Sequence, residues 1–250
     1  MAVSIKSARE IELMREAGKR LAHVHQELEA MIAPGISTWE IDAKGEKLIR
    51  DCGCIPNFLH YNGYPASICV SVNDEVVHGI PRKDRYLKEG DIVSLDAGLI
   101  YKGYHSDAAR THAVGKVSTE AQKLMDVTKQ SFFEGIKMAK EGQHLHDISR
   151  AIEEYVTPYG YGIVRDLGGH GIGTALHEDP QIPNYAQKRR GVRLQAGMTL
   201  AIEPMINAGT WQVRFLRDGW TVVTKDGSLS AHYENTILVT DGEPEILTLY

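Results

Sequence analysis

Apolar residues recur at helical spacing in two separate parts of the chain. In the first part, Ser7 and Glu10 have the spacing of a capping box, and the apolar positions that follow share one helical face: Ile11, Met14, Leu21 and Leu28. Pro34-Gly35 ends this predicted helix, and Ser37 and Glu40 repeat the capping spacing before a shorter one. In the second part, a long helix is predicted over about 119–139, with Gly142 after it and a shorter helix over about 146–156.

The order of a long helix, a glycine break and a shorter helix thus occurs twice, and the repetition continues downstream. Residues 87–98 align with residues 194–205 at a constant shift of 107, which pairs Gly90 with Gly197 and Asp96 with Glu203. A glycine before a strand is common, so any single match fits chance. The same order of elements at nearly the same shift favours an internal duplication, approximately 1–115 and 116–250, within a single catalytic domain, 1–250.

Alternating apolar and polar positions over residues 91–100 predict a strand, which returns through the turn at 101–103. One register places Asp96 directly opposite Asp107, and a turn centred one residue later makes them diagonal neighbours on the same face. Two carboxylates this close repel each other, so either one is protonated or both bind a cation. Two solvated aspartates are the alternative, but small and apolar neighbours, such as Ala97 and Ala108, favour a confined site.

Two glutamates stand in apolar strands of the second half. Glu203 precedes Pro204, which marks a strand edge or a bulge, and Glu234 lies in a second strand that an Asp-Gly turn introduces. Each buried charge needs a partner, and a salt bridge is the simple explanation for either one. Four acidic residues from both halves make cation binding the stronger explanation.

Three of the 11 histidines are candidates for the same site. His170 lies in a glycine-rich loop, 168–173, that suits close backbone approach. His177 follows seven residues later, and an extended segment would turn the two imidazoles to opposite faces. His78 precedes a glycine and a proline. We expect the other histidines to lie at the surface or in packing: His23, His25, His60, His105, His112, His144, His146 and His232.

Composition narrows the class of protein. A net charge of −5 argues against coating of nucleic acid, and 3 cysteines give no disulfide framework or thiol zinc site. No signal peptide is apparent, and prolines and asparagines interrupt the longest uncharged stretch, 52–73. We therefore expect a cytoplasmic protein without membrane or nucleic-acid contacts, and a monomer. Four carboxylates with an imidazole suit two divalent ions (Mn²⁺, Fe²⁺, Co²⁺ or Zn²⁺), so the residues predict a dinuclear hydrolase.

Eight short motifs in order resemble the type I methionine aminopeptidase family in its bacterial form. They are Asn62-Gly-Tyr64-Pro, Val77-His78-Gly-Ile-Pro81, Ser94-Leu-Asp96-Ala-Gly, Asp107, Gly169-His170-Gly-Ile-Gly173, His177-Glu-Asp-Pro180, Ile202-Glu203-Pro-Met205 and Glu234-Asn-Thr. The resemblance implies an α+β pita-bread fold, in which two pseudo-symmetric halves surround a central antiparallel β-sheet with helices on its outer face.

The family also implies roles for these positions. The metal ligands would be Asp96, Asp107, His170, Glu203 and Glu234, with Asp107 and Glu234 bridging two ions. Glu203 would shuttle the proton, His177 would stabilise the oxyanion, and His78 would contact the substrate amide. The methionine pocket would use Tyr61, Tyr64, Cys69 and Trp220. Departures from the commoner bacterial pattern affect the shape of this pocket and no ligand: Phe58, Asn62, Val77 and Leu176.

The resemblance thus predicts removal of the initiator methionine from nascent polypeptides whose second residue is small, with the ribosome as a candidate partner. Two alternatives remain open. One is a catalytically silent binding protein on the same fold, although no ligand position is lost. The other is an X-Pro peptidase of the same superfamily, although the large N-terminal domain of prolidase-like relatives is missing. Glu203 and Glu234 are too close in sequence for the helical insertion of type II relatives.

Overall fold

Four α-helices form where the apolar periodicity predicts them. The computed structural model describes residues 3–249, with α1 (Ala8–Glu29), α2 (Thr38–Asp51), α3 (Thr119–Ile136) and α4 (Leu145–Val156). Both predicted capping boxes are present, since the backbone N–H groups of Ser7 and Ser37 donate to the carboxylates of Glu10 and Glu40 at 2.7 and 2.8 Å. Short 3₁₀ turns lie at Tyr61–Gly63 (η1) and Thr157–Tyr159 (η2).

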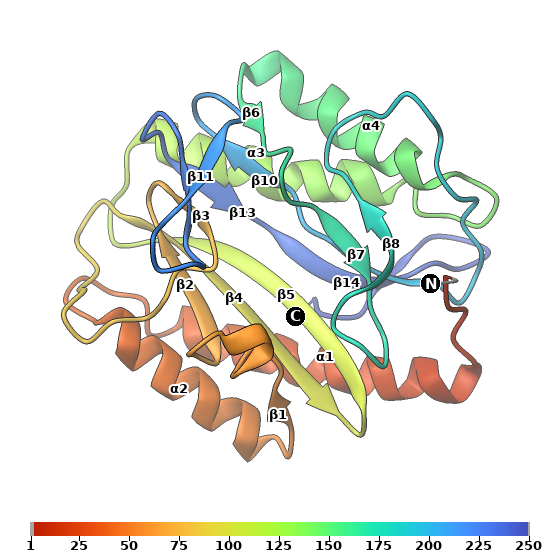
Figure 1. Cartoon of the computed structure of the whole chain (residues 1–250), viewed down its shortest axis with the longest axis horizontal. Coiled ribbons are helices and arrows are strands. Elements are labelled where there is room, and N and C mark those ends of the chain that lie inside the picture. The colour runs from red at the N-terminus through yellow and green to blue at the C-terminus, as the bar shows by residue number, and fades with distance from the viewer. Residues whose placement is uncertain (1–2, 250) are drawn as a thin grey trace.

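A large antiparallel sheet runs through the middle of the molecule (Figure 1). Its order is β1-β4-β5-β14-β9-β7-β8, and β2 pairs with β4 and β15 with β14. The strands are β1 (Ile55–Pro56), β2 (Ile68–Val72), β4 (Ile92–Tyr101), β5 (Tyr104–Ala113), β7 (Gly169–Gly171), β8 (Glu178–Ile182), β9 (Thr199–Ile202), β14 (Glu234–Leu238) and β15 (Glu245–Ile246). The pairing of β5 with β14 joins the two halves of the sequence into one sheet.

Two small sheets extend this framework. One has the order β13-β10-β6 and contains β13 (Ser230–His232), β10 (Met205–Asn207) and β6 (Gly162–Ile163). The other has the order β11-β12-β3 and contains β11 (Val213–Phe215), β12 (Val222–Thr224) and β3 (Glu75–Val77). All these pairs are antiparallel.

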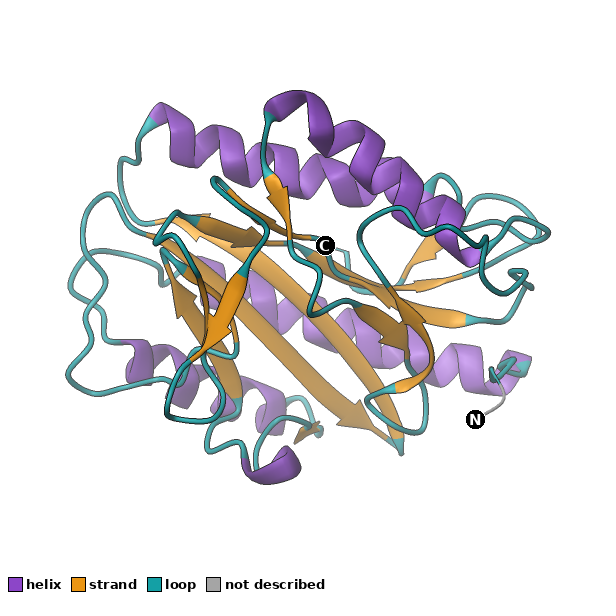
Figure 2. Cartoon of the chain, turned by 45° about the horizontal axis from the view of Figure 1, so that its top comes forward, coloured by secondary structure: helices purple, strands orange, loops and turns teal. Residues whose placement is uncertain are grey.

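Each helix pair covers its own part of the sheet. In Figure 1, α1 and α2 lie at the bottom and α3 and α4 at the top, with the long strands between them, and Figure 2 shows α1 behind those strands. The core under α1 and α2 contains Leu21, Leu28, Ile41 and Ile49, and the core under α3 and α4 contains Leu124, Phe132, Ile148 and Ile152. This α+β arrangement is the predicted pita-bread fold, because helices cover the outside of a shared antiparallel sheet.

The hairpin register decides how the first two carboxylates meet. The turn pairs Tyr101 with Tyr104, which sets Gly98 opposite Asp107 and Asp96 opposite Ala109. Asp96 and Asp107 are therefore diagonal neighbours on one face, the second of the two predicted registers. Gly98 leaves room for the buried Asn57 side chain, because a Cβ at this position would lie 2.3 Å from its amide oxygen.

No helix within residues 3–249 combines the length and the apolar character that a membrane span needs.

The internal duplication stays a prediction. The backbone at Gly90 and at Gly197, which the alignment pairs, has nearly the same φ, 91° and 92°, and this similarity supports the prediction.

The C-terminal segment crosses α1 at Gly18, where a Cβ would lie 2.2 Å from the carbonyl oxygen of Leu247. Gly18→Ala should therefore lower the free energy of unfolding by about 2 kcal/mol, since overpacking outweighs the helix propensity of alanine. Urea denaturation of the metal-free protein measures the effect. Glu27→Ala, at an exposed position of the same helix, is the control and should change stability by less than about 0.5 kcal/mol. Equal midpoints for both variants would contradict this close contact.

Candidate metal centre

The acidic side chains come from three neighbouring strands of the large sheet. Asp96 lies on β4 and Asp107 on β5, and Glu234 begins β14 opposite Ala109. Thr236 of β14 fixes the backbone at Asp107: its hydroxyl accepts from the Asp107 N–H at 3.0 Å and donates to the Asp107 carbonyl at 2.8 Å. The two halves are thus joined next to the carboxylates.

Glu203 follows the last residue of β9 and precedes β10. Pro204 lies in the break between β9 and β10, rather than at a strand edge or a bulge as predicted, and it has no N–H to donate to a ladder. The side-chain amide of Asn184 donates to the Glu203 carbonyl at 2.9 Å and holds this break in place. The Glu203 side chain is 14% exposed.

His170 lies in a short strand rather than in the predicted loop. Strand β7 pairs with both β8 and β9, and a Cβ at Gly169 or Gly171 would lie 2.3 or 2.2 Å from a carbonyl oxygen of a neighbouring segment. Close strand approach therefore explains these glycines. The Nδ1–H group of His170 donates to the Gly171 carbonyl oxygen at 2.8 Å, so the lone pair of Nε2 in the neutral ring is available to a metal ion. It is 3.7 Å from Glu203 Oε1 and 4.0 Å from Asp107 Oδ2.

His177 faces the same space as His170. Their ring centroids are 4.3 Å apart, because the chain between them bends instead of running extended. The expectation of opposite faces, which assumed an extended segment, is wrong for this reason. His177 also lies close to Tyr61, with Nδ1 2.8 Å from the phenol oxygen.

Burial makes this group of carboxylates unfavourable without a cation. Burial raises the pKa of Asp96 to about 7, and burial together with neighbouring carboxylates raises the pKa values of Asp107, Glu203 and Glu234 well above the ordinary range. Asp96 Oδ1, Asp107 Oδ1 and Glu234 Oε1 have no hydrogen-bond partner within the described residues. Because no hydrogen bond occupies them, these carboxylate oxygens are available as metal ligands.

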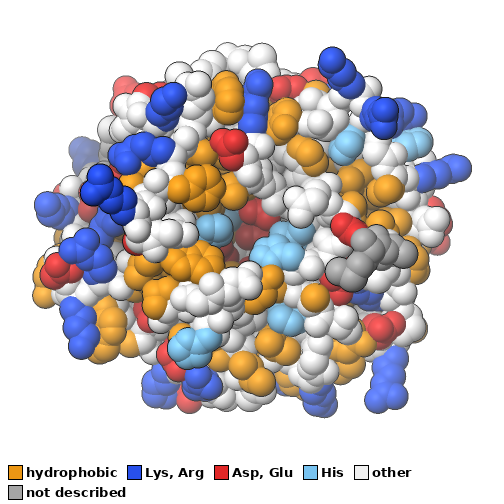
Figure 3. Space-filling model, in the orientation of Figure 1, with side chains coloured by type: hydrophobic (Ala, Val, Ile, Leu, Met, Phe, Trp, Pro, Cys, Tyr) orange, Lys and Arg blue, Asp and Glu red, His pale blue; other side chains and the backbone are white. Residues whose placement is uncertain are grey.

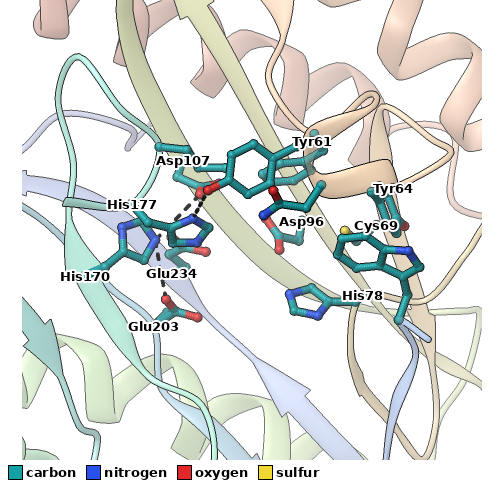
Figure 4. Close-up of a pocket in the computed structure, with 14 residues that line it drawn as sticks. Tyr61, Tyr64, Cys69, His78, Asp96, Asp107, His170, His177, Glu203 and Glu234 are labelled. Atoms are coloured by element: carbon teal, nitrogen blue, oxygen red, sulfur yellow. Dashed lines mark hydrogen bonds and ion pairs between the residues drawn. The ribbon is translucent and has the colours of Figure 1, made fainter. Parts of the chain in front are cut away.

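The donor atoms form two groups that share Glu234. Asp107, His170 and Glu234 form one, and Asp96, His232 and Glu234 form the other, with the donor atoms of each group within 4.8 Å of one another. Carboxylate oxygens with imidazole nitrogens fit divalent ions such as Mn²⁺, Fe²⁺, Co²⁺ and Zn²⁺. The residues present therefore fit a pair of ions with a shared carboxylate. Figure 4 shows the acidic side chains and His170 converging.

The four carboxylates and His170 line a pocket of about 220 Å³. Figure 3 shows the hollow, with acidic side chains at its base, histidines beside them and hydrophobic side chains around them. Every residue predicted for the site lines this pocket: Tyr61, Tyr64, Cys69, His78, Asp96, Asp107, His170, His177, Glu203, Trp220 and Glu234. Phe58, Asn62 and Leu176 line it too, whereas Val77 packs in a separate cluster with Val76 and Val222.

An apolar wall stands beside Asp96, away from His170 (Figure 4). Cys69 pairs with Asp96 across β2 and β4, and the edge of Tyr64 meets Trp220 at a centroid distance of 5.1 Å. The Tyr64 hydroxyl donates to the Gly79 carbonyl at 2.9 Å, which turns the ring into the wall. This wall offers sulfur and aromatic contacts to a flexible apolar side chain.

His78 approaches from the same wall. Its ring is 6.2 Å from Trp220, and its backbone has a φ of 58°, which is uncommon for a residue other than glycine. Burial, with a smaller effect of His177, lowers the pKa of His78 to about 4. His78 is therefore a neutral imidazole at pH 7.

His232 also lies beside the carboxylates. We expected a packing or surface residue; it is buried, and its Nε2 lies 3.7 Å from Glu203 Oε2 and 3.7 Å from Glu234 Oε2. The pairing of β13 with β10 brings it there, and that pairing between distant segments leaves no local pattern in the sequence.

Comparison with known proteins agrees with this geometry. The model of metallopeptidase family M24 matches residues 12–241. A methionine aminopeptidase of Clostridium acetobutylicum is 53% identical over 99% of both chains. The crystal structure of a methionine aminopeptidase from Thermotoga maritima has a TM-score of 0.97 at 46% identity and covers 100% of both chains. An Xaa-Pro dipeptidase from Bacillus anthracis, at 26% identity and a TM-score of 0.77, covers 98% of this chain and 61% of its own. The chain therefore belongs to metallopeptidase family M24, in its methionine aminopeptidase branch.

Proposed function

We propose that this protein is a metal-dependent aminopeptidase that hydrolyses the bond after an N-terminal methionine when the second residue is small. The observation that carries the proposal is the placement of buried carboxylates and His170 at the base of a pocket with a Tyr64, Cys69 and Trp220 wall. A thioether suits this wall because it is long, apolar and polarisable. The relatives named methionine aminopeptidase support the same substrate.

We assign the metal ligands to the five residues expected from the sequence: Asp96, Asp107, His170, Glu203 and Glu234. Two divalent ions, drawn from Co²⁺, Mn²⁺, Fe²⁺ and Zn²⁺, are proposed, and these five side chains would hold them. When bound, such ions lower the pKa of water toward neutrality and polarise a carbonyl. Side chains of the protein would transfer the proton and contact the substrate amide.

Glu203 is the proposed proton shuttle. A carboxylate at this position accepts a proton from the attacking water and passes it to the departing amine. The Glu203 side chain lines the pocket next to His170, a proposed metal ligand. In this proposal it therefore lies near both the attacking water and the amine that leaves.

The two histidines of the pocket act on the substrate amide in this proposal. The Tyr61 hydroxyl lies next to His177 Nδ1, so Nε2 of a neutral His177 is free to carry the proton and donate to the developing oxyanion. The neutral His78 stands beside Trp220 and contacts the scissile amide from the apolar wall. Phe58, Asn62 and Leu176 adjust the shape of the pocket.

The oligomeric state, the location in the cell and the partners of the protein also belong to the proposal. We expect a monomeric, cytoplasmic enzyme that meets nascent polypeptides near the ribosome, with one duplicated domain. The catalytically silent binding protein is disfavoured, because every expected ligand position has a residue that can bind metal and buried carboxylate oxygens there have no hydrogen-bond partner within the described residues. The X-Pro peptidase is disfavoured because the relatives that match the full length are named methionine aminopeptidase.

Glu203→Gln should reduce kcat for release of methionine from Met-Ala-Ser by roughly 10²–10⁴-fold, because the amide cannot accept the proton. Metal content, measured by elemental analysis, should stay near that of the wild type, since an amide oxygen remains. Glu27→Gln, at an exposed position of α1, is the matched control and should leave kcat unchanged. Near wild-type activity of Glu203→Gln would remove Glu203 from this role.

Titration of Mn²⁺ or Co²⁺ into chelator-stripped protein should show two equivalents bound by calorimetry. Asp96→Asn should reduce this to one strong equivalent, because Asp96 belongs to only one of the two donor groups. Turnover measured along the same titration tests the need for both ions. Full activity of the wild type at one equivalent would refute a dinuclear requirement.

A panel of peptides separates the two peptidase hypotheses. Met-Ala-Ser should be hydrolysed with a kcat/KM at least about tenfold above that of Met-Leu-Ser, about 1.4 kcal/mol in the barrier, because a bulky second residue clashes at the mouth. Ala-Pro should not be cleaved measurably. Chromatographic analysis of the released amino acids provides the measurement, and preferential cleavage of Ala-Pro would overturn the assignment.

A further inference from the structure

The imidazole of His232 is buried beside the carboxylates of Glu203 and Glu234. Its exposed fraction is 1%, and neither of its ring nitrogens has a hydrogen-bond partner within residues 3–249. It does not line the pocket at the metal centre and instead borders a second cavity, on the side of Arg110 and Lys129. Buried polar atoms without a partner are uncommon in native proteins and call for an explanation.

The geometry around His232 fits ligation better than hydrogen bonding. Its Nε2 is 3.7 Å from Glu203 Oε2 and from Glu234 Oε2, which is too long for a hydrogen bond. Two donors on one ion, each at about 2.0–2.2 Å, lie roughly 3–4 Å apart. The same separation of 3.7 Å joins His170 Nε2 to Glu203 Oε1. The two oxygens of Glu203 therefore face two different imidazoles.

The backbone holds His232 in this position from two sides. Thr111 of β5 accepts from the His232 N–H at 2.9 Å and donates to its carbonyl at 2.8 Å. On the other side, His232 pairs with Met205, two residues after Glu203. The backbone of His232 is thus held by β5, which carries Asp107, and by β10, which begins two residues after Glu203. A metal ligand requires a firmly held backbone of this kind.

A packing histidine elsewhere in the chain shows the contrast. His25 is also fully buried, but its Nε2 lies 2.8 Å from the carbonyl oxygen of Ala108. One ring nitrogen of His25 therefore has a hydrogen-bond partner. His232 has none among residues 3–249, and carboxylate oxygens of Glu203 and Glu234 lie 3.7 Å from its Nε2.

We propose that His232 is a sixth protein ligand of the metal centre and, with Asp96 and Glu234, gives the second ion an imidazole donor. This inference rests on the proposed function, because it concerns the same pair of ions. An imidazole in place of an all-oxygen set shifts the second position toward Co²⁺, Fe²⁺ and Zn²⁺ and away from Mn²⁺. Loss of an outer contact to a metal ligand already costs about 10–100-fold in affinity, so loss of a direct ligand should cost at least tenfold.

The test counts histidine ligands in the full-length protein loaded with Co²⁺. Proton NMR should show two strongly hyperfine-shifted, exchangeable imidazole N–H signals in the wild type, and incorporation of ¹⁵N-histidine identifies them. His232→Gln should remove one signal and His170→Gln the other. His23→Gln, at an exposed position, is the control and should retain both.

Calorimetry on the same proteins gives a second readout. His232→Gln should weaken binding of the second equivalent of Co²⁺ at least tenfold and reduce the preference for Co²⁺ over Mn²⁺ at that position. A single N–H signal in wild-type protein that holds two Co²⁺ ions would overturn the proposal without any variant. Unchanged spectra and affinities in His232→Gln would overturn it as well.

The outcomes separate this inference from the proposed function. Protein that binds two ions with two imidazoles but releases no methionine would refute the aminopeptidase and support the sixth ligand. Protein with one imidazole signal that releases methionine would support the aminopeptidase and refute the sixth ligand. Absence of any bound ion would refute both.

Discussion

Mutual repulsion of buried carboxylates is the constraint around which this structure is organised. Asp96, Asp107, Glu203 and Glu234 are packed within one small volume, and burial there raises their pKa values. An isolated charge would be expensive to bury, so the framework must hold these oxygens in place until a cation compensates them. The large sheet does this with backbone pairing on neighbouring strands, and Thr236 ties the strand of Asp107 to that of Glu234. Stability of the fold and affinity for metal are therefore linked.

The sequence predicted most of this arrangement because its signals are local. Capping boxes and apolar periodicity place the helices, since these depend on residues three or four positions apart. Alternation along residues 91–100 places Asp96 on a defined face, and the turn after it limits the registers to two. The ordered motifs predicted that distant residues, such as Asp107 and Glu234, belong to one site. Spacing alone does not determine this. The predicted site residues all reach one pocket for that reason.

The errors arose where a bend or a neighbouring strand decides the outcome. The expectation for His177 assumed an extended chain, and the bend after Gly171 instead brings its ring against His170. The glycines around His170 suggested a loop, whereas they permit close packing of β7 between two strands. His232 is buried, as one of the outcomes expected for it, but its approach to Glu203 was not predicted because it depends on the pairing of β13 with β10. Long-range pairing of this kind carries no local pattern.

The joining of the two halves through β5 and β14 has a consequence for synthesis of the protein. A chain that has emerged from the exit tunnel only as far as β5 presents two carboxylates, and the other donors follow over more than a hundred residues. Contacts between segments so far apart in sequence form late in folding. Translation must therefore pass Glu234 before the donor set is complete, so cation uptake marks the end of assembly rather than guiding its first steps.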